Sequence, residues 1–378
     1  MLVKKIITVL LMGISIFFIV YFAEKILSFT NEKKSNYSEL HEGCSRRYIL
    51  LREHEPLKNV IVEPNDSYMK ISDSLVQKKY RLRVDENGFI MPSKIYDQPD
   101  MSIVFLGGST TECLYMDEEN RFPYLTGRIL EKETGKKVNS YNSGISGNNS
   151  LHSLDILLNK IIPMKPNVVI MQHNINDLVI LMLRNTYWNF HPDEGPIVYP
   201  NTVIWNNPLK QALKRFVPNL YYRLRAIKDK ALRRFEDDEF KDVRGTLVYI
   251  DKRRIQNEFR MNLQTFINIC TVRKIAPVLM TQQNRFKEHL DEVIYNSVRI
   301  LKSDYGIEYK DYKEAYDLLN ETIRKVGKDN NILVIDLANE IPQEKEYIYD
   351  PVHLNDTGSK LTAQVINREL KKIINNVK

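Results

Sequence analysis

The chain has 378 residues, of which 43% are hydrophobic and 27% are charged, and its formal net charge is +7. This balance is typical of a folded globular protein and excludes a disordered or fibrous chain, and the length allows a sizeable core without disulfide bonds. The three cysteines, Cys44, Cys113 and Cys270, are widely spaced, so the sequence predicts neither a disulfide framework nor a zinc site. No pattern in the sequence calls for a metal or an organic cofactor.

The first feature along the chain is an apolar run at residues 6–23, which follows two lysines and ends at Glu24. A helix of about 18 residues is about 27 Å long, just enough to cross the hydrocarbon core of a membrane. We therefore predict an N-terminal transmembrane signal anchor over residues 1–28, and a single-pass membrane protein whose main domain faces the extracytoplasmic side. The alternative is a cleaved signal peptide, in which the apolar region is usually only about 7–15 residues long.

Two segments are expected between this run and the main domain. Residues 29–52 are polar and are predicted to form a tether. Residues 53–100 contain a strand-like stretch at 80–84 and a turn at 85–88, and we predict that they form a preamble packed on the main domain.

The main domain, residues 101–378, alternates apolar strand-like runs with helical patterns. Such alternation indicates parallel strands covered by helices on both faces, which is a three-layer α/β/α sandwich with a central parallel sheet. Strands are predicted at 103–106, 138–141, 167–171, 276–280 and 332–336, and helices at 123–133, 150–162, 252–272, 312–326 and 359–374. In sheets of this kind, ligands bind beyond the carboxyl ends of the strands.

A basic insertion at about 183–240 interrupts the alternation. Within it, residues 210–234 carry many lysines and arginines, and their apolar residues recur at three- and four-residue steps, which predicts an amphipathic helix. This helix could contact anionic lipid, could act as a lid over an acidic polymer, or could simply be a solvated basic face. Nucleic acid is not expected as a partner, because an outward-facing domain would not meet it.

The first candidate site residue, Ser109, follows the first strand of the main domain in Gly107-Gly108-Ser109. A serine between a strand and a helix start has an exposed hydroxyl and an amide near a helix N-terminus. Taken alone, the pattern equally suits a turn and a helix cap.

The ends of the second and third strands carry two further candidates. Gly147 could present its backbone N–H to a bound anion, because it has no side chain to block the approach. Asn176 could donate its side-chain amide to a developing oxyanion. The alternatives are a plain loop for Gly147 and helix capping for Asn176 and Asp177.

The segment Asp350-Pro-Val-His353 lies near the C-terminus. A spacing of three residues places the carboxylate and the imidazole on the same side of a turn. The carboxylate can then hold one imidazole nitrogen while the other faces outward, as a general base requires. A surface ion pair is the alternative interpretation of this motif.

Together, these four segments resemble the four motif blocks of the SGNH (GDSL-like) serine hydrolase family, in the family's order, from residue 101 to about residue 372. The resemblance implies a flavodoxin-like hydrolase fold with Ser109 as nucleophile, His353 as base and Asp350 as its orienting partner. It also implies an oxyanion hole made of the backbone N–H groups of Ser109 and Gly147 and the side chain of Asn176.

Two positions depart from the family pattern: the usual Asp-Ser pair is Gly108-Ser109, and the third block, Asn174-Ile-Asn-Asp, lacks its glycine. Cys113 lies one helical turn beyond Ser109, and we interpret it as buried filler rather than the nucleophile.

The expected activity is that of a serine esterase acting on an ester-bearing small molecule or on O-acetyl groups of a cell-surface glycan. The alternatives are an O-acyltransferase on a surface polysaccharide that uses the same triad, and a non-catalytic hydrolase-like binding module.

Overall fold

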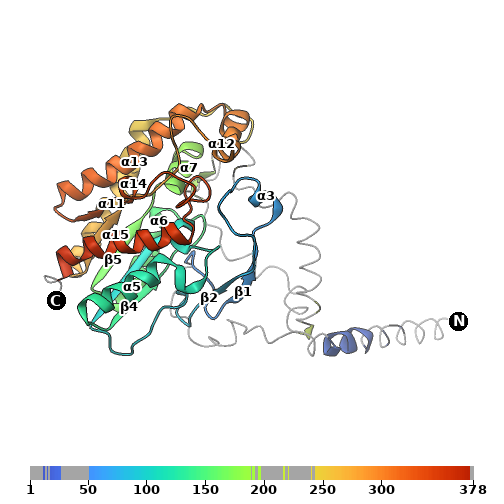
Figure 1. Ribbon diagram of the computed structural model, residues 1–378. Coiled ribbons are helices and arrows are strands. Elements are labelled where there is room, and N and C mark those ends of the chain that lie inside the picture. The colour runs from blue at the N-terminus through green and yellow to red at the C-terminus, as the bar shows by residue number, and fades with distance from the viewer. Residues whose placement is uncertain are drawn as a thin grey trace. The chain divides into compact units, whose positions relative to one another are not determined.

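The structure is a computed structural model that describes residues 51–188 and 243–374, together with residues 12, 15, 18–26, 190–191, 195–196, 216–217, 220 and 240. The chain divides into two compact units, one formed by residues 1–42 and 188–242 and the other by residues 43–187 and 243–378. The larger unit contains the central sheet (Figure 1). Its residue ranges include all five of the predicted site residues.

Strands and helices alternate through the larger unit. Its strands are β1 (Asn59–Val62), β2 (Tyr80–Arg83), β3 (Met101–Gly107), β4 (Val138–Asn142), β5 (Val168–Gln172), β8 (Ala276–Met280) and β9 (Leu333–Ile335). Its α-helices are α3 (Asp66–Met69), α4 (Ser109–Glu112), α5 (Phe122–Thr134), α6 (Ser150–Ile156), α7 (Ile175–Leu183), α11 (Lys252–Val272), α12 (Glu292–Tyr305), α13 (Tyr309–Asp329), α14 (Leu337–Glu340) and α15 (Asp356–Ile374). Three short helices, η1 (Glu118–Asn120), η2 (Leu157–Ile161) and η3 (Ile162–Met164), complete it, and the smaller unit includes strands β6 (Phe190–His191) and β7 (Gly195–Pro196).

The five strands expected in the main domain form one parallel sheet in the order β4-β3-β5-β8-β9. Each corresponds to one of the apolar runs bounded by glycine, proline or polar residues. The predicted α/β fold with a central parallel sheet is therefore confirmed.

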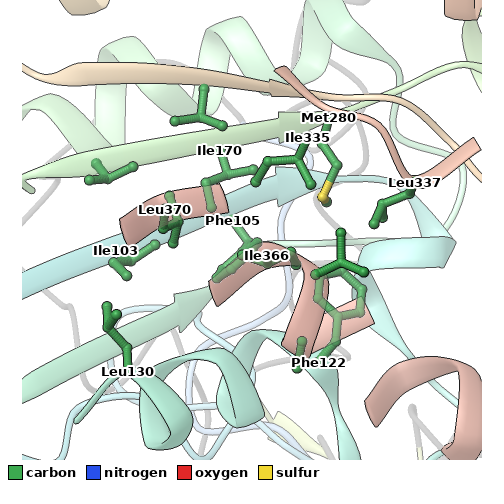
Figure 2. Close-up of a cluster of buried hydrophobic side chains, with 14 of the residues drawn as sticks. Ile103, Phe105, Phe122, Leu130, Ile170, Met280, Ile335, Leu337, Ile366 and Leu370 are labelled. Carbon is green, nitrogen blue, oxygen red and sulfur yellow. The ribbon is translucent and has the colours of Figure 1, made fainter. Parts of the chain in front are cut away.

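Helices pack on the sheet through apolar side chains that alternate along its strands. Ile103 and Phe105 of β3 point toward α5 and α15, which contact each other across the same side of the sheet (Figure 1, Figure 2). Val104 and Leu106 of β3 are equally buried. Because they alternate with Ile103 and Phe105, they point to the other side of the sheet. On that side α6 contacts β3, and α11 and α13 contact β8. Burial on both sides explains why the strands are continuous apolar runs.

Residues 51–100 pack against the sheet unit and contribute to its core. The antiparallel pair β1 and β2 continues into a bridge between Ile90 and Asn142 at the end of β4. Arg121, which is 1% exposed, donates hydrogen bonds to the carbonyl oxygens of Arg81 and Met91, at 2.8 and 2.9 Å. The buried guanidinium thus ties this segment to the start of α5.

The prediction of a single-pass membrane protein is wrong. In the part of the chain that the structure describes, no helix is long and apolar enough to cross a membrane. Most of the apolar run at 6–23, and nearly all of the predicted tether at 29–52, lie outside the described residues.

The basic segment at 210–234 also lies outside the described residues, except for 216–217 and 220. Its expected amphipathic helix, and its expected contact with lipid or an acidic polymer, therefore stay predictions.

Candidate active site

Ser109 lies just past the carboxyl end of strand β3, where it begins the four-residue helix α4. Its side chain is partly exposed, whereas Thr110, Thr111 and Glu112, which follow it in α4, are buried. The strand end therefore presents the serine hydroxyl at the surface, as the sequence pattern predicted.

The loop before α15 brings His353 to Ser109. The imidazole Nε2 of His353 lies 2.8 Å from the Oγ of Ser109, and its Nδ1 lies 2.7 Å from Oδ2 of Asp350. The side chain of His353 is 21% exposed, whereas that of Asp350 is 5% exposed. The three residues thus form a continuous hydrogen-bonded chain from a buried carboxylate to a partly exposed hydroxyl.

Backbone hydrogen bonds shape the Asp350–His353 turn. Oδ1 of Asp350 accepts from the backbone N–H groups of Val352 and His353, at 2.9 and 2.8 Å. The backbone N–H of Tyr349 donates to the carbonyl of His353, at 2.9 Å. The ring of Tyr349 stacks on the imidazole of His353 with a centroid distance of 5.7 Å. The carboxylate therefore both closes the turn with one oxygen and orients the imidazole with the other.

The pKa values of the pair move apart. Burial alone lowers the pKa of His353, but the Asp350 carboxylate and, more weakly, Glu112 outweigh burial, so this pKa lies above 6.5. Burial alone raises the pKa of Asp350, but His353 and the backbone donors outweigh it, so this pKa lies below 3.8. Asp350 is consequently ionised at neutral pH and stabilises a protonated imidazole.

Asn176 lies directly beside the residue that precedes the serine. A Cβ atom placed on Gly108 would lie 2.5 Å from Nδ2 of Asn176 and 3.1 Å from the carbonyl oxygen of Asn148. Nδ2 of Asn176 donates to that same carbonyl, at 2.8 Å. Glycine at position 108, where the family usually has aspartate, thus leaves room for the amide beside the nucleophile.

Gly147 lies in the loop after β4, immediately before Asn148. Its φ angle of +78° favours glycine, and its carbonyl accepts a hydrogen bond from Nη1 of Arg52, at 3.1 Å. The structure thus connects the Gly147 loop to Asn176 and Gly108 through Asn148.

Glu112 is a buried residue at the site that the sequence motifs did not indicate. Its Oε2 accepts from the backbone N–H of Ser146, at 2.8 Å, and from the Ser146 hydroxyl, while its Oε1 lies 2.9 Å from Nε2 of His54. The carboxylate therefore fixes the loop that carries Gly147 to the helix that carries Ser109.

The polar residues of the third motif segment do not cap helix α7, which was one of the two alternatives that the sequence left open. Asn174 occupies the cap position of α7 but makes no side-chain cap bond. The buried Asp177 carboxylate instead accepts from the backbone N–H and the hydroxyl of Ser150 and from the hydroxyl of Tyr187. Asn174 stands where the family has glycine, and its φ of −167° lies outside the left-handed region that favours glycine.

Cys113 follows α4 and is buried. Burial raises the pKa of its thiol to about 12, so the reactive thiolate is absent at neutral pH. Its sulfur lies 3.4 Å from the carbonyl of Thr110, within the same turn. Among residues 51–188 and 243–374, no group of three or more His, Cys, Asp or Glu residues could hold a metal ion.

Comparison with solved structures finds similar folds. A mutant of an acetyl-xylooligosaccharide esterase from Geobacillus stearothermophilus is 14% identical with a TM-score of 0.42, over 72% of this chain and 94% of the other. A lipase/acylhydrolase from Enterococcus faecalis is 18% identical with a TM-score of 0.41, over 74% and 97%. A GDSL-like lipase from Bacteroides thetaiotaomicron is 13% identical with a TM-score of 0.38, over 72% and 89%.

The search of curated proteins finds no match. The model of the GDSL-like lipase/acylhydrolase family, in contrast, matches residues 105–361, which is more than half of the chain and includes Ser109 and His353. The resemblance seen in the motifs is thereby confirmed: the chain belongs to the GDSL-like lipase/acylhydrolase family and is a hydrolase of ester bonds.

Proposed function

We propose that the protein is a serine esterase in which Ser109 is the nucleophile, His353 the general base and Asp350 the residue that orients the histidine. The observation that carries this proposal is the continuous contact from Asp350 through His353 to Ser109, at 2.7 and 2.8 Å. Such distances lie within the reach that proton transfer requires. The raised pKa of His353 supports a base that can hold the proton it takes.

The reaction proceeds in two steps. The Oγ of Ser109 attacks the carbonyl carbon of the ester while Nε2 of His353 takes the hydroxyl proton. Collapse of the tetrahedral intermediate breaks the bond to the alcohol oxygen, which leaves with the proton from His353. Water then attacks the acyl-serine with the help of His353, and the acid is released.

The oxyanion of the intermediate is held by the backbone N–H groups of Ser109 and Gly147 and by the side-chain amide of Asn176. One hydrogen of the Asn176 amide is already engaged by the carbonyl of Asn148, which orients the side chain and leaves the second hydrogen for the oxyanion. Each such donor typically lowers the barrier by about 2.7–4 kcal/mol.

The acyl group that we propose is short, with acetyl as the first candidate. The groups packed around Gly108 are polar, namely the Asn176 amide and the Asn148 carbonyl, whereas a long acyl chain requires an apolar channel. We propose a carbohydrate as the alcohol partner, because Tyr68, whose hydroxyl contacts Asp350, packs on Tyr115 and both residues are half-buried, so that an aromatic ring is available beside the triad for a sugar ring to stack on.

The test compares the full-length protein with its Ser109→Ala and His353→Ala variants on p-nitrophenyl esters of acetate, butyrate and octanoate and on acetylated xylan. The proposal predicts fastest turnover of acetate esters and release of acetate from the glycan, with both variants inactive. Retention of full esterase activity in either variant would remove that residue from the triad. Fastest turnover of octanoate would refute the short acyl group, and transfer of acetate to an added sugar would replace hydrolysis by acyl transfer.

A further inference from the structure

We propose that Tyr68, a residue of the N-terminal segment, is a positioning residue of the active site that tunes His353 through a hydrogen bond to Asp350. The inference rests on the proposed roles of His353 and Asp350. The inference extends the site to a part of the chain that lies outside the four motif segments. Tyr68 and Asp350 are separated by 282 positions in the sequence.

The contact is a direct hydrogen bond. The phenol of Tyr68 donates to Oδ2 of Asp350 at 2.9 Å, and this is the same oxygen that lies 2.7 Å from Nδ1 of His353. With the backbone donors of Val352 and His353 on Oδ1, the carboxylate has two partners on each oxygen. Tyr68 therefore supplies the fourth donor of a carboxylate that is buried.

Several features hold the phenol in this position. Tyr68 lies in the short helix α3, whose cap residue Asn65 accepts a hydrogen bond from the backbone N–H of Tyr68, at 2.8 Å. Its ring packs against Tyr115, which follows α4, and edge-on against Tyr349, at centroid distances of 5.2 and 6.4 Å. The backbone N–H of Asp73 donates to the carbonyl of Tyr349, at 3.0 Å. The segment after β1 is thus docked on Tyr115 and on Tyr349, the residue that precedes Asp350.

The hydrogen bond has a defined chemical consequence. A donor to an ionised carboxylate stabilises its charge and makes it less basic. Asp350 then attracts the proton on His353 less strongly, so the Tyr68 hydroxyl keeps the pKa of His353 lower than the bare ion pair would set it. Burial and the negative charge of Asp350 in turn raise the pKa of Tyr68 well above 10, so the phenol remains protonated and donates its hydrogen to Asp350.

Other charged and titratable groups surround the pair and are left unchanged by a substitution at Tyr68. They are Glu112, Cys113 and Tyr115 in or just after α4, Asp73 in the N-terminal segment, and Tyr349 and Arg285 around the turn itself.

The test is the pH dependence of labelling of the full-length protein by a fluorophosphonate, which reports the reactivity of the serine without a known substrate. In Tyr68→Phe, the midpoint of the acid limb is expected to move upward by about half a pH unit or more. A half-unit shift slows labelling about threefold at a pH well below the midpoint. Phenylalanine keeps the ring contacts with Tyr115 and Tyr349, so a purely structural role predicts an unchanged midpoint.

Tyr80→Phe is the matched control. The ring of Tyr80 packs on Tyr115 at a centroid distance of 5.9 Å, but its hydroxyl donates to the carbonyl of Val76, at 2.6 Å, and not to the triad. The pH profile of labelling of Tyr80→Phe should coincide with that of the parent protein. Superimposable profiles for the parent and Tyr68→Phe would overturn the inference while leaving the proposed esterase intact.

A second measurement does not depend on labelling. Proton NMR of the Nδ1 hydrogen of His353 should show a resonance that changes position in Tyr68→Phe but not in Tyr80→Phe, at a temperature well below the unfolding midpoint of each protein. If the parent protein does not label, the proposed function fails, and this resonance still decides the inference. An unchanged resonance in Tyr68→Phe would refute it.

Discussion

Replacing Gly108 by alanine should impair the oxyanion site while leaving the three triad side chains in place. The added Cβ would lie 2.5 Å from Nδ2 of Asn176, whereas ordinary contacts begin at 3.4 Å, so the amide must retreat by about 0.9 Å. An oxyanion donor acts over about 2.7–3.1 Å, and a displacement of this size removes it from that range. Gly108 has φ −91°, so alanine introduces no backbone strain, and the clash with Asn176 is the cause of the effect.

The expected loss is that of one oxyanion donor, about 2.7–4 kcal/mol or roughly 100- to 1000-fold in turnover. The assay is the steady-state hydrolysis of p-nitrophenyl acetate by Gly108→Ala, Asn176→Ala and the double variant. Because alanine at position 176 removes the atom that clashes, the double variant should be no slower than Asn176→Ala alone.

Gly135→Ala separates loss of stability from loss of activity. Gly135 ends α5 with φ +70°, and nothing lies within 4 Å of its added Cβ, so alanine there strains the backbone far from the site. It should lower the unfolding midpoint and leave turnover unchanged. Near-normal turnover in Gly108→Ala, or effects of Gly108→Ala and Asn176→Ala that multiply in the double variant, would refute the reasoning.

Three further outcomes are expected. Turnover of p-nitrophenyl acetate should fall as the pH drops through the pKa of His353, with a midpoint above 6.5 because Asp350 raises that pKa; a midpoint below 6.5 would contradict the assignment. Burial raises the pKa of Asp177 from 3.8 to about 6, so its contribution to stability is complete below pH 3.8 and is lost as the pH rises through 6. Relative to Asp177→Asn, which cannot titrate, the parent should therefore lose about 2.4 kcal/mol of unfolding free energy between pH 4 and pH 7, as measured by urea denaturation; a pH-independent difference would exclude this role. Cys113→Ala should keep full fluorophosphonate labelling, because the buried thiol with a pKa of about 12 takes no part, and loss of labelling in a folded variant would show otherwise.

The sheet could be predicted because its signals are local. Each of the five strands is buried on both sides and therefore is a short apolar run between breaking residues. The ends of these strands meet at one edge of a parallel sheet, so serine and asparagine residues far apart in sequence could be expected at one site. The Asp350–His353 contact was predictable because only three positions separate the two residues.

The remainder of the site depends on contacts that no local pattern records. The hydrogen bond from Tyr68 to Asp350 joins two distant segments, and Glu112 is bound by Ser146 and approached by His54 from two other segments. Nothing in the sequence around Tyr68 distinguishes it from the other tyrosines of the chain. The membrane prediction was based on the apolar content of one run, most of which lies outside the described residues.

The most direct test of the central assignment is mass spectrometry of the full-length protein after reaction with a fluorophosphonate. Attack by the serine oxygen on phosphorus expels fluoride and leaves a phosphonylated residue. The account predicts a single adduct on Ser109 that is absent from Ser109→Ala and from His353→Ala, although both variants remain folded. A folded parent protein that forms no adduct, or one modified at a different serine, would contradict the assignment of Ser109 as the nucleophile.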